Sequence, residues 1–281
     1  MALPITVGFD RNEASYAAVR WAAAEAARRA LDLRIVHCPH LPIVSDIVPG
    51  WNPPTVEGDE ELNQLRSNLA VTHPDVRVTI DLRPGVPWVN LCDPSYPSEL
   101  IVVGSSERRG APAFWLGRTP RGVVRHARCP VIVARGDTTI AERVVVGIDG
   151  SNGAAKALQW AIEEANLHNA PMKVVHVWEY PYAPIGAPES PPRDAMQVEA
   201  ARILGEAVQS ARQECVAEVD RELLEGSPSV LLPDAVSAGD LLVLGSRGRG
   251  PLRSGLLGST VNSVLDNIAV SVAIIPRDSA P

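Results

Sequence analysis

Short apolar runs alternate along this chain with longer segments of helical periodicity. The runs "VVVGI" from Val144, "VVHVW" from Val174 and "LLVLG" from Leu241 are continuously apolar and rich in β-branched residues. Such runs are typical of parallel strands that are buried on both faces. Residues 153–168, between the first two runs, repeat small and apolar positions at helical spacing. The alternation predicts a doubly wound α/β fold of the Rossmann-like type.

The whole pattern occurs twice. Three residues recur 139 positions further along the chain, Gly8, Asp10 and Trp21 as Gly147, Asp149 and Trp160. After a gain of two residues the shift becomes 141, and it relates Gly85, Pro87 and Gly104 to Gly226, Pro228 and Gly245. Self-similarity of this kind indicates a repeated structural unit. We therefore predict two domains, residues 1–137 and 143–281, each with a five-stranded, mainly parallel sheet and flanking helices.

Composition and charge limit the classes of function that this chain is expected to have. The chain has 281 residues, of which 46% are hydrophobic and 21% charged, and its formal net charge is −7. These values are typical of a soluble globular protein, and the negative charge argues against a general nucleic-acid binder. Neither a signal peptide nor a membrane helix is predicted, so we expect a cytoplasmic protein. The cysteines and histidines lack metal-ligand spacing, and we expect no structural metal site.

A glycine-rich stretch follows the apolar run that ends in the second copy at Gly245. Gly245, Gly248 and Gly258 have the spacing G-x2-G-x9-G, and Ser259 and Thr260 come directly after them. Glycine lets backbone N–H groups approach an anion, and a helix N-terminus favours negative charge. We predict that the nine intervening residues return Gly258 beside the first glycines, and that Ser259 and Thr260 form an N-cap pair that binds phosphoryl oxygens. The alternative is a flexible surface loop.

The position of this loop in the fold favours the phosphate interpretation. Asp149 ends the first strand of the second copy, and the loop from Gly245 follows the fourth strand. In an open α/β sheet, ligands bind beyond the carboxyl ends of the strands where the strand order reverses. A sheet in which these two strands are neighbours would bring Asp149 and the loop to one crevice. Capping of the first helix by Asp149, and by Asp10 in the first copy, is the alternative role.

At these residues the chain resembles the universal stress protein family in its tandem form. ATP-binding members of the family carry G-x2-G-x9-G-S/T, which the second copy matches at Gly245, Gly248, Gly258 and Ser259. The resemblance implies an adenine-nucleotide-binding domain of the adenine nucleotide alpha hydrolase-like fold, with ATP and Mg²⁺ as expected ligands. It also implies an adenine pocket beside the second strand, for which Val175 and Val177 are the candidates. Asp149 then becomes a contact to nucleotide or metal.

The first copy departs from this motif. Gly104 and Gly117 keep the spacing, but Glu107 stands where the second glycine is expected and Arg118 where the serine is expected. Asp10 and Thr119 complete the candidate residues of this copy. The side chain and negative charge of Glu107 disfavour a polyphosphate. We predict that the second domain binds ATP more tightly and that the first is weak, altered or empty.

Two further residue groups have competing interpretations. His37 and His176 lie inside apolar runs, where we expect hydrogen-bonded packing and no chemistry. Arg249 and the neighbouring arginines of the loop belong either to a solvated surface or to the phosphate site, where they would neutralise charge. The proline-rich segments after the second strand of each copy, residues 40–54 and 180–192, are either lids or tolerated insertions.

The sequence favours binding over rapid catalysis. It contains no Walker A loop and no kinase HRD or DFG element, and the glycine-rich loop offers no evident general base. We expect an ATP-binding regulator or sensor in stress response or growth control. A slow ATPase or nucleotide-transfer enzyme is the first alternative, and a nucleotide-free assembly scaffold is the second. The family resemblance also implies pairing of the two halves at their last strands and a further homodimer; no protein partner is indicated.

Overall fold

The structure is a computed structural model that describes residues 2–39, 55–105, 116–180, 192–248 and 257–277. The chain divides into two compact units, Met1–Thr139 and Ile140–Pro281. This division falls between the predicted domain ends, 137 and 143. Arg249, Glu107 and almost all of the two proline-rich segments lie outside the described residues.

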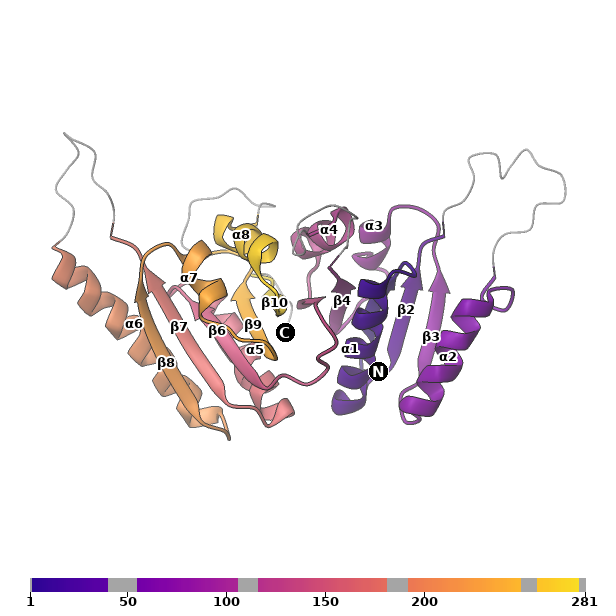
Figure 1. The fold of residues 1–281 in the computed structure, drawn as a ribbon, viewed down its shortest axis with the longest axis horizontal. Helices are drawn as coiled ribbons and strands as arrows, with labels where there is room; N and C mark the ends of the chain where they lie inside the picture. The colour runs from indigo at the N-terminus through magenta and orange to yellow at the C-terminus, as the bar shows by residue number, and fades with distance from the viewer. Residues whose placement is uncertain (1, 40–54, 106–115, 181–191, 249–256, 278–281) are drawn as a thin grey trace. The chain divides into compact units, whose positions relative to one another are not determined.

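The first unit alternates strands and helices, as the apolar pattern predicts. Its elements are β1 (Ile5–Phe9), α1 (Glu13–Arg29), β2 (Leu33–His37), α2 (Glu60–Thr72), β3 (Val78–Leu82), α3 (Pro87–Leu91), β4 (Leu100–Gly104), α4 (Arg118–His126) and β5 (Val131–Ala134) (Figure 1). The strand order is β3-β2-β1-β4-β5, and every pairing within it is parallel. The predicted α/β class is therefore confirmed for this unit.

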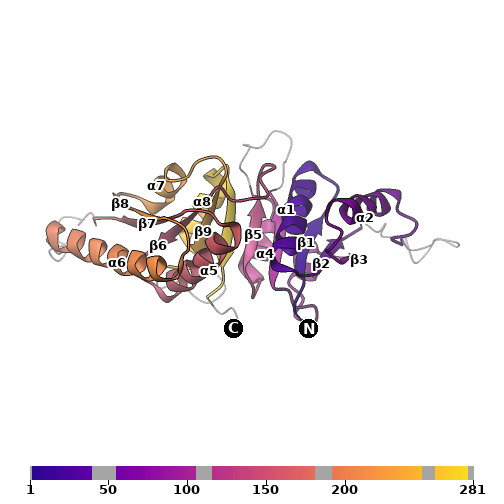
Figure 2. The same ribbon diagram turned by 90° about the horizontal axis from the view of Figure 1, so that it is seen from below.

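The second unit repeats this arrangement. Its elements are β6 (Arg143–Ile148), α5 (Asn152–His168), β7 (Met172–Trp178), α6 (Arg193–Glu214), β8 (Val219–Glu225), α7 (Pro228–Asp234), β9 (Asp240–Gly245), α8 (Ser259–Asn267) and β10 (Ser271–Ile275). The strand order is β8-β7-β6-β9-β10, again parallel throughout. Helices α5 and α6 cover one face of this sheet, and α7 and α8 cover the other (Figure 2).

The sheet order explains where the crevice forms. In the second unit β6 pairs with β7 on one side and with β9 on the other, so the chain reverses its direction of winding between β6 and β9. Helices that follow these two strands cover opposite faces, which leaves an opening beyond their carboxyl ends. β1 and β4 hold the same position in the first unit. The predicted adjacency of first and fourth strands is confirmed in both units.

The central strands form the core of each sheet. Val7, Ile35 and Val102 are completely buried in the first unit, and Val146 and Val243 are completely buried in the second. This burial agrees with the continuous apolar runs, since strands covered on both faces have no solvent-facing side. Among the described residues, none of the helices has the length and the apolar character needed to cross a bilayer.

The two strand histidines serve packing, as predicted. His37 is buried, and its Nδ1 lies 2.8 Å from the backbone oxygen of Phe9. His176 repeats this contact with the backbone oxygen of Ile148 at 2.8 Å. Because a carbonyl oxygen only accepts, Nδ1 carries the hydrogen in both residues. Each imidazole therefore joins the carboxyl end of one strand to that of its neighbour.

Candidate functional site

The predicted site residues of the second unit meet at a cavity of about 230 Å³. It lies beyond the carboxyl ends of β6, β7 and β9, at the reversal of strand order. The predicted residues that line it are Asp149, Val177, Gly245, Gly248, Gly258, Ser259 and Thr260. Val175 is fully buried in β7, where it pairs with Gly147, and it is not among the lining residues.

The glycine-rich loop closes on itself as the G-x2-G-x9-G spacing predicts. Ser246 N donates to the backbone oxygen of Ile275 at 2.8 Å, which fixes the start of the loop beside β10. Gly258 N donates to the backbone oxygen of Ser246 at 3.1 Å, which brings the end of the loop back to its start. Two stretches of backbone that are far apart in this loop therefore meet at the rim of the cavity.

The helix after this loop begins one residue earlier than the sequence indicated. Gly258 is the N-cap of α8, while Ser259 and Thr260 are its first two helical residues, so the prediction of a Ser–Thr N-cap pair is wrong. Gly258 has no side chain to cap with, and the first intrahelical bond runs from Asn262 N to Gly258 O at 3.1 Å. The N–H groups of the first turn consequently lack a side-chain cap and are available to an anion in the cavity.

Glycine occurs at the three positions of the motif for different physical reasons. A Cβ built on Gly245 would lie 2.8 Å from the backbone carbon and oxygen of Gly153, at the start of α5. Gly245 is therefore required by close packing within the protein. Among the described residues, a Cβ on Gly258 would meet nothing closer than the backbone oxygen of Ser246 at 3.7 Å, an ordinary contact distance. Packing does not demand a glycine at Gly258, and the space that a side chain would fill there belongs to the cavity.

Asp149 lies at the end of β6 with its carboxylate against the loop. Its Oδ1 accepts a hydrogen bond from Ser151 N at 2.9 Å, and Ser151 Oγ accepts from Ala154 N at 3.2 Å. Ser151 is thus the N-cap of α5, and Asn12 has the same role at α1. Asp149 therefore does not cap α5 itself; it orients Ser151, which does. A Cβ on Gly248 would collide with Asp149 Oδ2, so that glycine lets the loop pack against the carboxylate.

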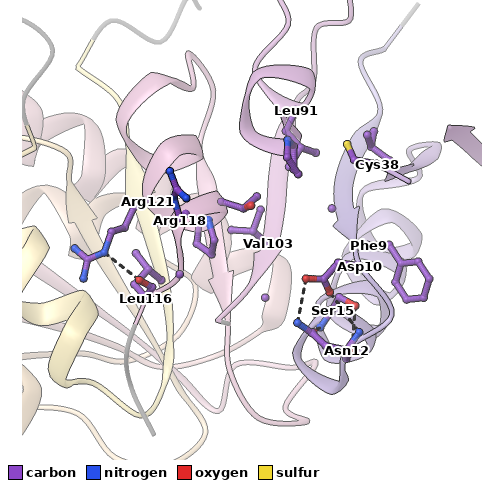
Figure 3. A pocket seen from close by; sticks show the side chains of 17 residues that line it. Phe9, Asp10, Asn12, Ser15, Cys38, Leu91, Val103, Leu116, Arg118 and Arg121 are labelled. Atoms are coloured by element: carbon purple, nitrogen blue, oxygen red, sulfur yellow. Dashed lines mark hydrogen bonds between the residues drawn. The ribbon is translucent and has the colours of Figure 1, made fainter. Parts of the chain in front are cut away.

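The first unit contains a larger cavity at the equivalent position, about 740 Å³ in volume (Figure 3). All four candidate residues of that copy line it, namely Asp10, Gly104, Gly117 and Thr119. Figure 3 shows Arg118 and Arg121 of α4 on one side and Asp10 with Asn12 on the other. Asp10 accepts from Asn12 N at 3.3 Å and from Asn12 Nδ2 at 3.0 Å. Burial raises the pKa of the Cys38 thiol, which also lines the cavity, and keeps it protonated.

The short third helix of each unit also lines its cavity, which no motif in the sequence predicted. Pro87 and Leu91 of α3 line the first cavity, and Pro228 and Leu232 of α7 line the second. The repeat contained a usable signal, because both pairs are related by the same shift of 141 residues as Gly104 and Gly245. Apolar residues retained at matching positions of a repeat mark a shared packing or binding surface.

The fold and the two cavities define a class of protein: tandem doubly wound α/β units, each with a loop and a helix N-terminus at the reversal of strand order. The model of the universal stress protein family matches residues 1–135 and 141–276, nearly all of both units. The chain belongs to the universal stress protein family, in agreement with the resemblance of its motif.

Known relatives match either the whole of this chain or about half of it. The chain is 30% identical over 304 residues to the universal stress protein Rv2623 of Mycobacterium tuberculosis (strain ATCC 25618 / H37Rv), covering 99% of this chain and 97% of the relative. A crystal structure of a universal stress protein from Archaeoglobus fulgidus DSM 4304 is 20% identical, covers 97% of this chain and 98% of its own, and superposes with a TM-score of 0.67. A universal stress protein solved in complex with cAMP covers 48% of this chain and 98% of its own at 27% identity, with a TM-score of 0.38.

Proposed function

We propose that the second unit binds ATP and that the chain acts as a nucleotide-dependent regulator or sensor in stress response or growth control. The observation that carries this proposal is the open space at Gly258. The packing of the described residues leaves room for a side chain there, yet the residue is a glycine at the N-cap of a helix without a side-chain cap. A phosphate group that approaches the backbone would account for both facts.

The residues around the cavity suit the parts of the nucleotide. The N–H groups of Ser259 and Thr260 and their hydroxyls would hold phosphoryl oxygens, and Val177 would contact the adenine from β7. Asp149 is the one acidic residue among the described lining residues, so it would share a Mg²⁺ ion with the phosphates. The cavity of about 230 Å³ is smaller than typical small-molecule sites, so in this proposal the phosphate chain would lie at its rim.

Binding without rapid turnover agrees with this set of residues. Among the described lining residues no histidine or second carboxylate accompanies Asp149 to act as a general base. In the proposed role ATP stabilises the conformation that binds it and shifts the population of the protein toward that state. Regulation then depends on which partners recognise the occupied form.

The first test is to identify nucleotide that co-purifies with the protein. The chain is purified without added ligand and denatured, and the released small molecules are separated by chromatography. We expect ATP, in up to one equivalent for the second unit. Recovery of ADP instead would indicate the slow ATPase, whereas no nucleotide together with no ATP binding by calorimetry would leave the scaffold role.

Substitution of Gly258 by alanine separates ligand binding from folding. The added Cβ lies at least 3.7 Å from every atom of the described part of the chain that it faces, so we expect the free energy of unfolding to change little. The same Cβ occupies the space of the phosphate, and the loss of one charged hydrogen bond corresponds to roughly a tenfold loss of ATP affinity. Isothermal titration calorimetry measures the affinity, and urea unfolding supplies the control. An unchanged affinity would remove the observation on which the proposal rests.

A charge reversal tests the loop arginine beyond the described residues. If Arg249 neutralises phosphate, Arg249→Glu should weaken ATP binding, and more strongly at low ionic strength because exposed charges are screened by salt. Titrations at two salt concentrations measure this difference. An affinity equal to that of the parent protein at both concentrations would assign Arg249 to the solvated surface.

A further inference from the structure

The third strand of each unit is an edge strand. Among the described strands, β3 pairs only with β2, and β8 pairs only with β7 (Figure 1). The free side of an edge strand presents backbone N–H and C=O groups that can pair with a strand of another chain. Proteins commonly shield such an edge with their own side chains, and the two units differ in this respect.

Side chains of the second unit cap the free edge of β8. The backbone groups of the even-numbered residues in this strand face β7, so those of Val219 and Arg221 face the free edge. The backbone oxygen of Val219 accepts a hydrogen bond from Arg212 Nη2 of α6 at 3.1 Å. Arg221 N donates to Asp220 Oδ1 at 2.7 Å. These two edge groups are therefore satisfied within the chain.

The free edge of β3 lacks such caps. The odd-numbered residues of this strand bond to β2, as shown by Leu33 N, which donates to the backbone oxygen of Arg77 at 2.9 Å. Val78 and Ile80 therefore direct their backbone groups to the free edge. Among the described residues, no side chain hydrogen-bonds to these groups. This edge can consequently accept a partner strand.

The residues that cap β8 are replaced in the first unit. The shift of 141 residues relates Arg212 to Val71 and Asp220 to Thr79. Val71 has no polar side-chain atom and is 82% exposed near the end of α2. Thr79 Oγ1 donates to the backbone oxygen of Leu33 in β2 at 3.4 Å, on the side away from the free edge. Both shielding contacts are thus specific to the second unit.

The charges along β3 complement those of a second copy in one antiparallel register. With Thr79 opposite Thr79 of the second copy, Arg77 lies opposite Asp81 at both ends of the pair. The next registers on either side that keep the same residues hydrogen-bonded place like charges opposite each other, Arg77 with Arg83 or Asp75 with Asp81. Arg77 is exposed, and Asp81 uses only Oδ2 to accept from Arg83 Nη2, at 3.1 Å.

We propose that the free edge of β3 pairs antiparallel with β3 of a second copy of this chain, in the register that joins Arg77 to Asp81. Val78 and Ile80 exchange backbone hydrogen bonds with Ile80 and Val78 of the second copy. The same surface is used by both copies, so the contact closes at two chains. A pair of five-residue strands buries less than the standard interface of about 1,200 to 2,000 Å², so the dimer dissociates on dilution. Nucleotide binding by the second unit is not needed for this contact.

Analytical ultracentrifugation of the full chain over a range of concentrations tests the proposal. We expect a monomer–dimer equilibrium for the parent chain. Arg77→Asp and Asp81→Arg each place like charges opposite each other at both ends of the strand pair, so each should raise the dissociation constant roughly tenfold. An equimolar mixture of the two variants should associate as the parent does, because the mixed dimer has opposite charges at both ends.

Two further variants control for folding and for the position of the contact. Ile80→Pro removes an N–H that faces the free edge and not β2, so it should prevent association while circular dichroism shows the fold retained. Arg221→Asp alters an exposed charge on β8 and should leave association unchanged.

Four results would contradict the proposal. They are a parent chain that stays monomeric at every concentration, charge variants that dimerise like the parent, a mixture of the two charge variants that fails to associate, and weaker association caused by Arg221→Asp. The second of these results is expected if two copies associate through their last strands instead.

Discussion

Replacing Gly248 by glutamate is expected to abolish ATP binding by the second unit at ordinary ligand concentrations. The substitution gives the second loop the residue that the first copy has at Glu107. At about 5 Å and an effective dielectric constant of about 20, repulsion between a carboxylate and one phosphate charge is on the order of 3 kcal/mol. The expected loss of affinity is therefore at least about a hundredfold, measured by calorimetry in the presence of Mg²⁺.

Two companion variants separate charge from bulk in this experiment. Gly248→Ala adds the Cβ, which would press on Asp149 Oδ2, without adding charge. Its affinity should lie between those of the parent and the glutamate variant. Glu107→Gly makes the reciprocal change in the first unit and should strengthen triphosphate binding there. If the glutamate variant binds ATP as tightly as the parent, the phosphate chain does not run along this loop.

Gly245→Ala is expected to destabilise the second unit by about 1 to 3 kcal/mol, the range typical of overpacked sites. The new Cβ would lie 2.8 Å from the backbone of Gly153 and 3.2 Å from Ala154 N, and backbone atoms cannot rotate away as a side chain can. Gly104→Ala should act in the same way on the first unit, where the Cβ would collide with the backbone oxygen of Ala14. Urea unfolding measures both effects.

Gly205 offers a matched control for this prediction. It lies within α6, and a Cβ built on it has no neighbour within 4 Å. Because glycine is a poor helix former, Gly205→Ala should stabilise the second unit by about 0.5 to 1 kcal/mol. We therefore expect the same type of substitution to raise the free energy of unfolding at Gly205 and to lower it at Gly245. A neutral result at Gly245 would mean that the start of α5 shifts to make room.

The sequence predicted the architecture because the central strands are nearly continuous apolar runs. "VVVGI" and "LLVLG" are short and rich in β-branched or leucine residues, which favours strands covered on both faces, and β6 and β9 are central strands of their sheet. The second copy supported the same prediction independently, because Asp10 and Asp149 follow the equivalent strand in the two copies. Only the adjacency of the first and fourth strands was expected from the sequence, since it brings the acidic residue and the glycine-rich loop to one crevice; the rest of the strand order comes from the structure.

The details of the site were harder to predict because they depend on distances between segments remote in sequence. No pattern in the chain distinguishes Gly245, which packing requires, from Gly258, which it does not. The cap of α8 was misplaced by one residue because Ser259 is a better capping residue than Gly258 by propensity, yet the loop closure puts Gly258 at the turn. The volumes of the two cavities could not be predicted either, because they depend on how side chains from separate segments of the sequence orient in the folded units.

The histidines that join neighbouring strand ends also anchor the backbone that presents the carboxylates. The Nδ1–H of His176 donates to the backbone oxygen of Ile148, the residue directly before Asp149. His37 holds Phe9 before Asp10 in the same way. The tip of the first strand in each unit is therefore tied to the second strand by a side chain, one residue before the carboxylate that faces the cavity.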